Sequence, residues 1–197
     1  MTMQDDAYLK CINPQCGLEY TIKCINVQCE NGHMLDVKYK NIPSDNLKKV
    51  FYERRNSQGN IFNESGVWRF RELLNFCQID TENIEECSKY LVSLDGAEGR
   101  QSKPYQMSKV AKFVEISNEY LWLQPEGYNP SGSFKDNGMA TAVTHAKMIG
   151  AKKIVCASTG NTSASAGMFA ANEGINCDVY IPAGQIAPGK LSQAYQF

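Results

Sequence analysis

Residues 120–181 decide the fold of this chain, and they read YLWLQPEGYNPSGSFKDNGMATAVTHAKMIGAKKIVCASTGNTSASAGMFAANEGINCDVYI. Three short apolar runs, YLWLQ, KKIVCA and CDVYI, predict strands, and the runs DNGMATAVTHAKMIG and SASAGMFAAN predict helices. The first helix is expected to end at Gly150 and the second near Gly174. This order predicts an α/β fold, a parallel sheet with flanking helices and right-handed crossovers. The side chains expected to face the core from the first helix are Met139, Ala142, Val143, Ala146 and Ile149.

A loop with unusual residues follows each predicted strand. These loops are QPEGYNPSGSFKD, STGNTS and PAGQIAPGK. Because parallel strands end at one edge of a sheet, all three are expected there, where the following helices also present their amino termini. The sequence therefore predicts a small-molecule site at the carboxyl edge of the sheet.

Two of these loops carry residue types suited to chemistry. Lys135 stands at the start of a predicted helix, whose positive end favours an uncharged amine that can attack an aldehyde. An ordinary ion pair within the Lys-Asp sequence is the alternative. The loop STGNTS is suited to a carboxylate or phosphate, and simple helix capping by Thr162 or Ser163 is its alternative.

Both loops resemble known motifs. Residues 129–136, NPSGSFKD, resemble the cofactor-lysine motif of the threonine synthase family, and residues 157–165, ASTGNTSAS, resemble its substrate loop. Further matches are SGVWRFRELL, IPAGQIAPGKLSQA and the cysteine-rich start. The resemblance implies the fold of the fold-type II pyridoxal-phosphate enzymes, of the tryptophan synthase β type.

The resemblance also implies roles for individual residues. Pyridoxal 5'-phosphate would be held by Lys135, with Asn161 donating a hydrogen bond toward its ring oxygen. The residues that would hold the substrate are Ser158, Thr159, Asn161 and Thr162. The implied reaction, a carbon-oxygen lyase reaction, converts O-phospho-L-homoserine and water to L-threonine and phosphate. A serine or threonine dehydratase, an enzyme of O-phosphoserine β-replacement, and a non-catalytic zinc-binding module on a degenerate enzyme domain are the alternatives.

The chain departs from the family pattern at several positions. Asn137 stands where the family usually has arginine, and residues 102–105, SKPY, stand where it often has Thr-Pro-Leu. The chain ends at Phe197, before the glycine-rich phosphate loop of the family. We therefore expect an amino-terminal fragment with little turnover of its own. The full-length protein is expected to be a possible homodimer.

Four cysteines near the start suggest a metal site. Two Cys-x4-Cys pairs that bracket short turns can complete a tetrahedral thiolate site for structural zinc, like that of a zinc ribbon. His33 is a competing ligand, and half-buried structural cysteines without metal are the alternative. Gly17 and Gly32 are expected to supply left-handed backbone near the turns. The predicted ligands are Cys11, Cys16, Cys24 and Cys29.

The whole chain divides into three predicted parts: residues 1–40, a cysteine-rich zinc-ribbon-like segment; 41–118, a lead-in segment; and 119–197, the first part of the catalytic domain. In the lead-in segment VWRFRELLNF predicts a packing helix, with Val67, Phe70, Leu73 and Leu74 on one face. Cys77 and Cys87 are expected to be core residues.

Composition narrows the class of protein. The chain has 197 residues, of which 43% are hydrophobic and 21% charged, so it can bury a core. A net charge of −1 provides no field to attract nucleic acid or an anionic membrane. No segment resembles an export signal or a membrane span. A small-molecule substrate and a cytoplasmic location are therefore expected.

Overall fold

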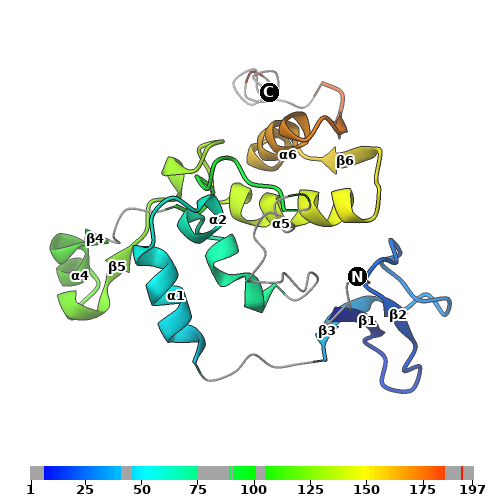
Figure 1. The fold of residues 1–197 in the computed structure, drawn as a ribbon, viewed down its shortest axis with the longest axis horizontal. Helices are drawn as coiled ribbons and strands as arrows, with labels where there is room; N and C mark the ends of the chain where they lie inside the picture. The colour runs from blue at the N-terminus through cyan, green and yellow to red at the C-terminus, as the bar shows by residue number, and fades with distance from the viewer. Residues whose placement is uncertain are drawn as a thin grey trace.

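A computed structural model describes residues 7–40, 46–74, 89, 91–100, 105–184 and 192. Figure 1 shows a small three-stranded sheet at one end of the molecule, beside the carboxyl-terminal half of helix α5. Helix α4 and the strands β4 and β5 lie at the opposite end. Helices α5 and α6 lie between these ends, next to the short parallel sheet.

The amino-terminal unit is an antiparallel sheet with strand order β2-β1-β3. Tyr8 of the central strand pairs with Thr21 on one side and Lys38 on the other. Gly17 and Gly32 have φ values of 63° and 76°, which confirms the prediction that the turns need left-handed backbone there. The strands are β1 (Ala7–Cys11), β2 (Glu19–Thr21) and β3 (Leu35–Tyr39).

Helices α1 (Leu47–Asn56), α2 (Ile61–Glu64) and the 3-10 helix η1 (Trp68–Leu73) follow. The face predicted for VWRFRELLNF is confirmed only in part. Val67 lies in the core and Leu74 packs against it, whereas Leu73 is 47% exposed and Trp68 and Arg71 are buried. The cause is the three-residue turn of a 3-10 helix, which places residues three apart on one side, together with non-helical backbone inside it.

The predicted strand YLWLQ is also displaced from its expected sheet. Its residues Trp122–Leu123 form β5, which pairs antiparallel with β4 (Tyr105–Gln106) across α4 (Ser108–Phe113) and η2 (Asn118–Tyr120). Both β5 side chains are exposed. The described parallel sheet therefore has two strands, β6 and β7, rather than the three that the sequence predicts.

The remaining elements confirm the predicted alternation of helix and strand. Strands β6 and β7 are parallel, in the register Val155 to Asp178. Gly150 and Gly174, with φ of 72° and 65°, follow the two helix ends. The elements are η3 (Glu126–Tyr128), α5 (Lys135–Met148), β6 (Lys153–Ala157), α6 (Asn161–Asn172) and β7 (Asn176–Tyr180).

The buried face of α5 differs from the predicted stripe. Of the five predicted side chains only Val143 is fully buried, and Ala142 is exposed. The buried face includes Thr144 because the Thr144 hydroxyl accepts a hydrogen bond from Val92 N at 2.9 Å and donates one to Ala140 O at 2.8 Å. The residues of α5 that are buried are Asp136, Ala140, Val143 and Thr144.

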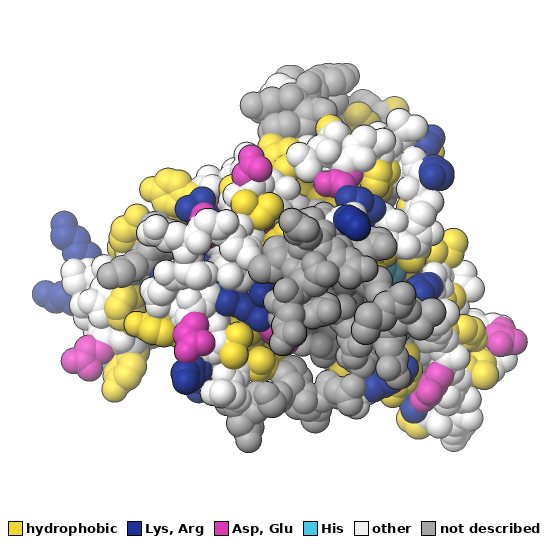
Figure 2. Space-filling view, in the orientation of Figure 1, with side chains coloured by type: hydrophobic (Ala, Val, Ile, Leu, Met, Phe, Trp, Pro, Cys, Tyr) yellow, Lys and Arg dark blue, Asp and Glu magenta, His cyan; other side chains and the backbone are white. Residues whose placement is uncertain are grey.

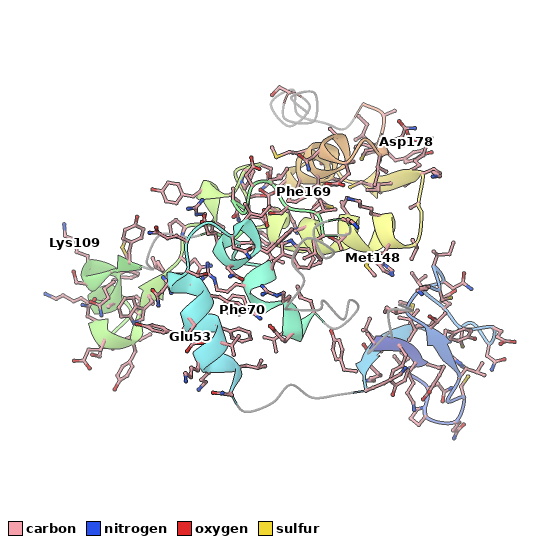
Figure 3. The ribbon with its side chains drawn as sticks, viewed as in Figure 1. Glu53, Phe70, Lys109, Met148, Phe169 and Asp178 are labelled. Carbon is pink, nitrogen blue, oxygen red and sulfur yellow. The ribbon has the colours of Figure 1, made fainter. Side chains whose placement is uncertain are left out.

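One hydrophobic core joins the lead-in segment to the helices. Phe169, labelled in Figure 3, projects from α6 into the interior and is fully buried, as is Trp68. The Trp68 indole donates to Val92 O at 2.8 Å. The predicted core residues Cys77 and Cys87 lie outside the described residues. The core comprises Phe62, Val67, Trp68, Leu91, Val92, Ala140, Val143 and Phe169.

Candidate active site

Lys135 is the first residue of α5 and is half-buried. Its Nζ lies 4.5 Å from the centroid of the Phe134 ring, a cation-π contact. Among the residues that the structure describes, no carboxylate pairs with this amine. The ion pair that an adjacent Lys-Asp sequence allows is therefore not formed in the described part of the chain.

Asp136 is instead engaged on the other side of the helix. This fully buried carboxylate accepts hydrogen bonds from Ser131 N at 2.7 Å, from the Ser131 hydroxyl, and from Ser165 Oγ at 2.6 Å. Ser131 belongs to the turn that precedes Lys135, and Ser165 belongs to α6. Asp136 thus fastens the lysine-bearing turn to the helix that follows the STGNTS loop.

Asn129 organises the same turn from within. Its Oδ1 accepts from Gly99 N at 2.7 Å, and its Nδ2 donates to Glu126 Oε2 at 2.8 Å and to Ser133 O at 3.0 Å. A buried amide that satisfies both donors and acceptors in this way fixes the backbone. Sequence reasoning assigned no role to this residue, although asparagine in a Pro-Gly turn is a signal of such bonding.

Asn137 occupies the position where arginine is usual in the resembling family. Its Nδ2 donates to Glu126 Oε2 at 3.1 Å, whereas its buried Oδ1 has no hydrogen-bond partner among the described residues. A Cβ added at Gly99 would lie 3.0 Å from that Oδ1. The Asn137 side chain therefore lies between Gly99 and Glu126 and bonds to Glu126.

The second predicted loop leaves the carboxyl end of β6. Ser158, Thr159 and Thr162 are half-buried there, and Asn161, the first residue of α6, is exposed. The N-cap of α6 is Gly160, without a side-chain cap, and Ser163 Oγ donates to Gly160 O at 2.6 Å. Capping by Thr162 or Ser163 therefore does not explain the loop. The uncapped amino end of a 12-residue helix is suited to an anionic group.

Of the four amino-terminal cysteines, three lie close together in the structure and one lies apart. Three of them, Cys11, Cys16 and Cys29, lie with His33 so that their ligand atoms are all within 4.8 Å of one another. Cys24 is not in this group. The Cys29 Sγ is 3.8 Å from that of Cys11, 3.9 Å from that of Cys16 and 3.7 Å from His33 Nδ1.

The cysteine environments differ in their electrostatics. A hydrogen bond from Asn31 Nδ2 at 3.3 Å is the main cause that lowers the pKa of the Cys16 thiol to about 6. Burial raises the pKa of Cys11. Cys16 therefore loses its proton more readily than Cys11.

The residues at the amino end of α5 fit a cofactor held by lysine. The amine has no carboxylate partner in the described part, the neighbouring Asp136 is occupied by serine donors, and the uncapped end of α6 is joined to the same turn. An aldehyde cofactor with an anionic phosphate needs such a free amine and such hydrogen-bond donors.

Comparison with known proteins agrees with this geometry. The family model of the pyridoxal-phosphate dependent enzymes matches residues 103–197, which include Lys135, Asn161 and the β6-β7 sheet. This part of the chain is similar to the pyridoxal-phosphate dependent enzymes, and the match confirms the cofactor expected from the sequence.

Several threonine synthases are similar to this chain in sequence. The chain is 36% identical over 186 residues to threonine synthase of Methanocaldococcus jannaschii, covering 94% of this chain and 40% of the relative. It is 33% identical over 188 residues to threonine synthase of Methanosarcina acetivorans, covering 95% and 40%. Over 74 residues it is 61% identical to threonine synthase of Mycobacterium leprae, covering 38% and 21%. The chain thus spans 40% or less of the length of these relatives.

Among the residues that are coloured by type in Figure 2, Lys and Arg side chains are interspersed with Asp and Glu. This distribution agrees with the net charge of −1. In the part of the chain that the structure describes, no helix has both the length and the apolar character needed to cross a bilayer.

Proposed function

We propose that this chain supplies the lysine-bearing part of a threonine synthase, which converts O-phospho-L-homoserine and water to L-threonine and phosphate. One observation carries the proposal: Asp136 and Ser165 join the turn of Lys135 to the helix that follows STGNTS. The two motifs of the family are therefore held together, and the similarity to three threonine synthases supports the choice of reaction.

Each residue has a proposed task. Lys135 holds the cofactor and then moves protons at the α and β carbons of the substrate. Asn161 donates toward the ring oxygen of the cofactor, while Ser158, Thr159 and Thr162, with the amino end of α6, bind the substrate carboxylate. The chemistry that pyridoxal phosphate supplies is an electron sink for carbanions at the substrate carbons.

The first experiment asks which lysine binds the cofactor. The purified protein is incubated with pyridoxal phosphate, reduced with borohydride and digested, and the labelled peptide is identified by mass spectrometry. Label at Lys135 is expected, with an absorbance band at about 410–430 nm before reduction. The Lys135→Arg variant should lose both signals. Lys153→Arg, which alters a lysine already paired with Asp178, should keep them.

Label spread over many lysines, or unchanged in Lys135→Arg, would show that Lys135 is not the cofactor lysine. Such a result would remove the basis of the proposed role.

The second experiment identifies the substrate. The protein that contains this chain is assayed for phosphate release from O-phosphohomoserine and from O-phosphoserine, and the carbon product is identified. Threonine and phosphate from the first substrate are expected. Release from O-phosphoserine alone would mean β-replacement or elimination chemistry instead, because the two substrates differ by one methylene between the reacting carbon and the phosphate.

We also propose a cytoplasmic location and a small-molecule substrate without nucleic acid. The described cysteines are all free thiols, as suits a reducing compartment, and the evenly mixed charge supports the absence of a nucleic-acid partner. A homodimer of the full-length protein stays a prediction.

A further inference from the structure

The amino-terminal unit has almost no apolar core of its own. Between residues 7 and 40, the buried apolar side chains are Ala7, Cys11, Ile22 and Cys29, two of which are thiols. Larger apolar side chains of the same unit, such as Ile25 at 80% and Val27 at 70%, are exposed. A unit of this size needs another source of folding free energy, such as a disulfide or a metal ion.

The sulfur positions distinguish these two sources. A disulfide requires sulfur atoms about 2 Å apart. Cys29 Sγ is instead 3.8 Å from Cys11 Sγ and 3.9 Å from Cys16 Sγ, and all three thiols are free. No pair of these three is therefore cross-linked, and the cysteines converge without bonding to one another.

Those separations match the edges of a metal-centred tetrahedron. Two thiolates bound at about 2.3 Å to one zinc ion, at the tetrahedral angle, lie about 3.8 Å apart, and a thiolate and an imidazole nitrogen lie about 3.6 Å apart. The distances of 3.8 and 3.9 Å between sulfurs, and of 3.7 Å from Cys29 Sγ to His33 Nδ1, agree with these values.

We propose that Cys11, Cys16, Cys29 and His33 bind one zinc ion. The predicted all-cysteine set is thereby changed, with His33 in the place of Cys24. Four protein ligands leave no open position for substrate or water, so the metal is structural rather than catalytic. This site is independent of the cofactor at Lys135.

Neighbouring groups hold the ligands in place. The backbone N-H of Asn13 donates to Cys11 Sγ at 3.4 Å, and Asn31 Nδ2 donates to Cys16 Sγ at 3.3 Å. Hydrogen bonds of this kind stabilise and orient metal-bound thiolates. The Nε2 of His33 lies 3.1 Å from Nδ2 of Asn13, whose Oδ1 accepts from Gln15 N at 3.0 Å. Coordination through Nδ1 leaves the imidazole proton on Nε2, so in the bound state the Asn13 amide has to turn and present its oxygen to Nε2.

The folded unit has a partner within the chain. His145 Nε2 lies 3.0 Å from the Ile22 carbonyl oxygen, and Ile22 is 8% exposed. His145 belongs to α5, the helix that begins with Lys135. The zinc ion therefore stabilises a unit that packs on the helix carrying the cofactor lysine.

The test is metal analysis of the full chain, purified under reducing conditions. About one zinc per chain is expected, with a tetrahedral thiolate spectrum after replacement by cobalt. His33→Gln and Cys29→Ser should each lower the bound zinc about tenfold or more. Cys24→Ser is the matched control and should retain the metal, because Cys24 lies outside the cluster.

A variant that replaces one ligand by another separates loss of the metal from loss of folding. His33→Cys should keep one metal ion, and its cobalt form should gain thiolate charge-transfer intensity by about one third, from three thiolates to four. The proposal is overturned if the reduced chain binds no zinc, if it holds iron instead, or if Cys24→Ser loses the metal while His33→Gln keeps it.

Discussion

At the scale of single residues, Asp136 is the most constrained polar group of the candidate site. We expect Asp136→Asn to lower the free energy of unfolding by about 2–3 kcal/mol, because an amide replaces a buried carboxylate that accepts from Ser131 and Ser165. Asp178→Asn, which alters a surface ion pair with Lys153, should cost less than about 1 kcal/mol. Urea denaturation compares the two, and equal effects would contradict the assigned role of Asp136.

Thr144 allows a similar comparison within one helix. Thr144→Val keeps the volume but removes the acceptor of the buried Val92 N-H, so we expect a loss of about 1–3 kcal/mol in thermal or urea unfolding. Thr141→Val removes a hydroxyl that bonds, among the described residues, to Gly138 O near the surface, and should change stability by less than about 0.5 kcal/mol. The reverse order of effects would show that the Val92 contact contributes little.

Two glycines should respond in opposite directions to alanine. A Cβ at Gly66 would lie 1.8 Å from Gly99 O, so Gly66→Ala should destabilise the protein by at least about 3 kcal/mol. A Cβ at Gly138, in α5, meets nothing within 4 Å, and Gly138→Ala should stabilise it by about 0.5–1 kcal/mol. Melting temperatures measured side by side decide the point, and a tolerated alanine at position 66 would contradict the close backbone approach.

At the scale of elements, an ion pair joins α1 to η1. Arg54 bonds Arg69 O at 2.8 Å and both carboxylate oxygens of Glu72, and Figure 3 shows neighbouring Phe70 beside α1. Burial raises the pKa of Glu72, but the hydrogen bonds and charge of Arg54 outweigh it and hold that pKa below its ordinary value.

This lowered pKa predicts acid sensitivity. The folded carboxyl binds its proton less readily than the unfolded one, so its stabilisation is full above the ordinary carboxyl pKa and is lost as the pH falls through the folded pKa. Glu72→Gln should cost about 1–3 kcal/mol at neutral pH and flatten the loss of stability between about pH 5 and pH 3. Urea unfolding at several pH values measures this, and parallel curves for the two proteins would contradict it.

The sequence predicted the elements whose signals are local. Apolar runs bounded by Gly150 and Gly174 are sufficient to locate α5, β6, α6 and β7. The predictions were wrong where contacts between residues far apart in the sequence determine the structure. Thr144 is drawn inward by Val92, 52 residues away, and β5 pairs with β4 rather than with β6. Periodicity carries no information about such partners.

In the candidate site too, local features could be predicted and long-range contacts could not. Lys135 and the STGNTS loop could be predicted from their residue types and from the motif. The bond between Asp136 and Ser165, which spans 29 residues, and that between Asn129 and Gly99, which spans 30, could not, because single hydrogen bonds leave no periodic pattern. The sequence predicts His33 only as a competing ligand, because four cysteines with the same spacing cannot be told apart until the positions of their turns are known.

At the scale of the whole molecule, the contact of His145 with Ile22 joins the amino-terminal unit to α5. We expect His145→Ala to accelerate amide hydrogen exchange in residues 7–39, because the Ile22 carbonyl loses its donor, while zinc content stays unchanged. Lys147→Ala, on the same helix but paired with Glu173 of the α6 end, should leave that exchange unaltered. Equal exchange in both variants would show that the histidine does not hold the unit.

The same contact has a consequence for the order of events on the ribosome. Ile22 and His145 are 123 residues apart in the sequence, and at about 5–20 residues per second their syntheses are separated by roughly 6–25 s. The clustered ligands all lie between residues 11 and 33 and emerge together. The first unit can thus close around the proposed zinc ion while the nascent chain still lacks the helix on which that unit packs.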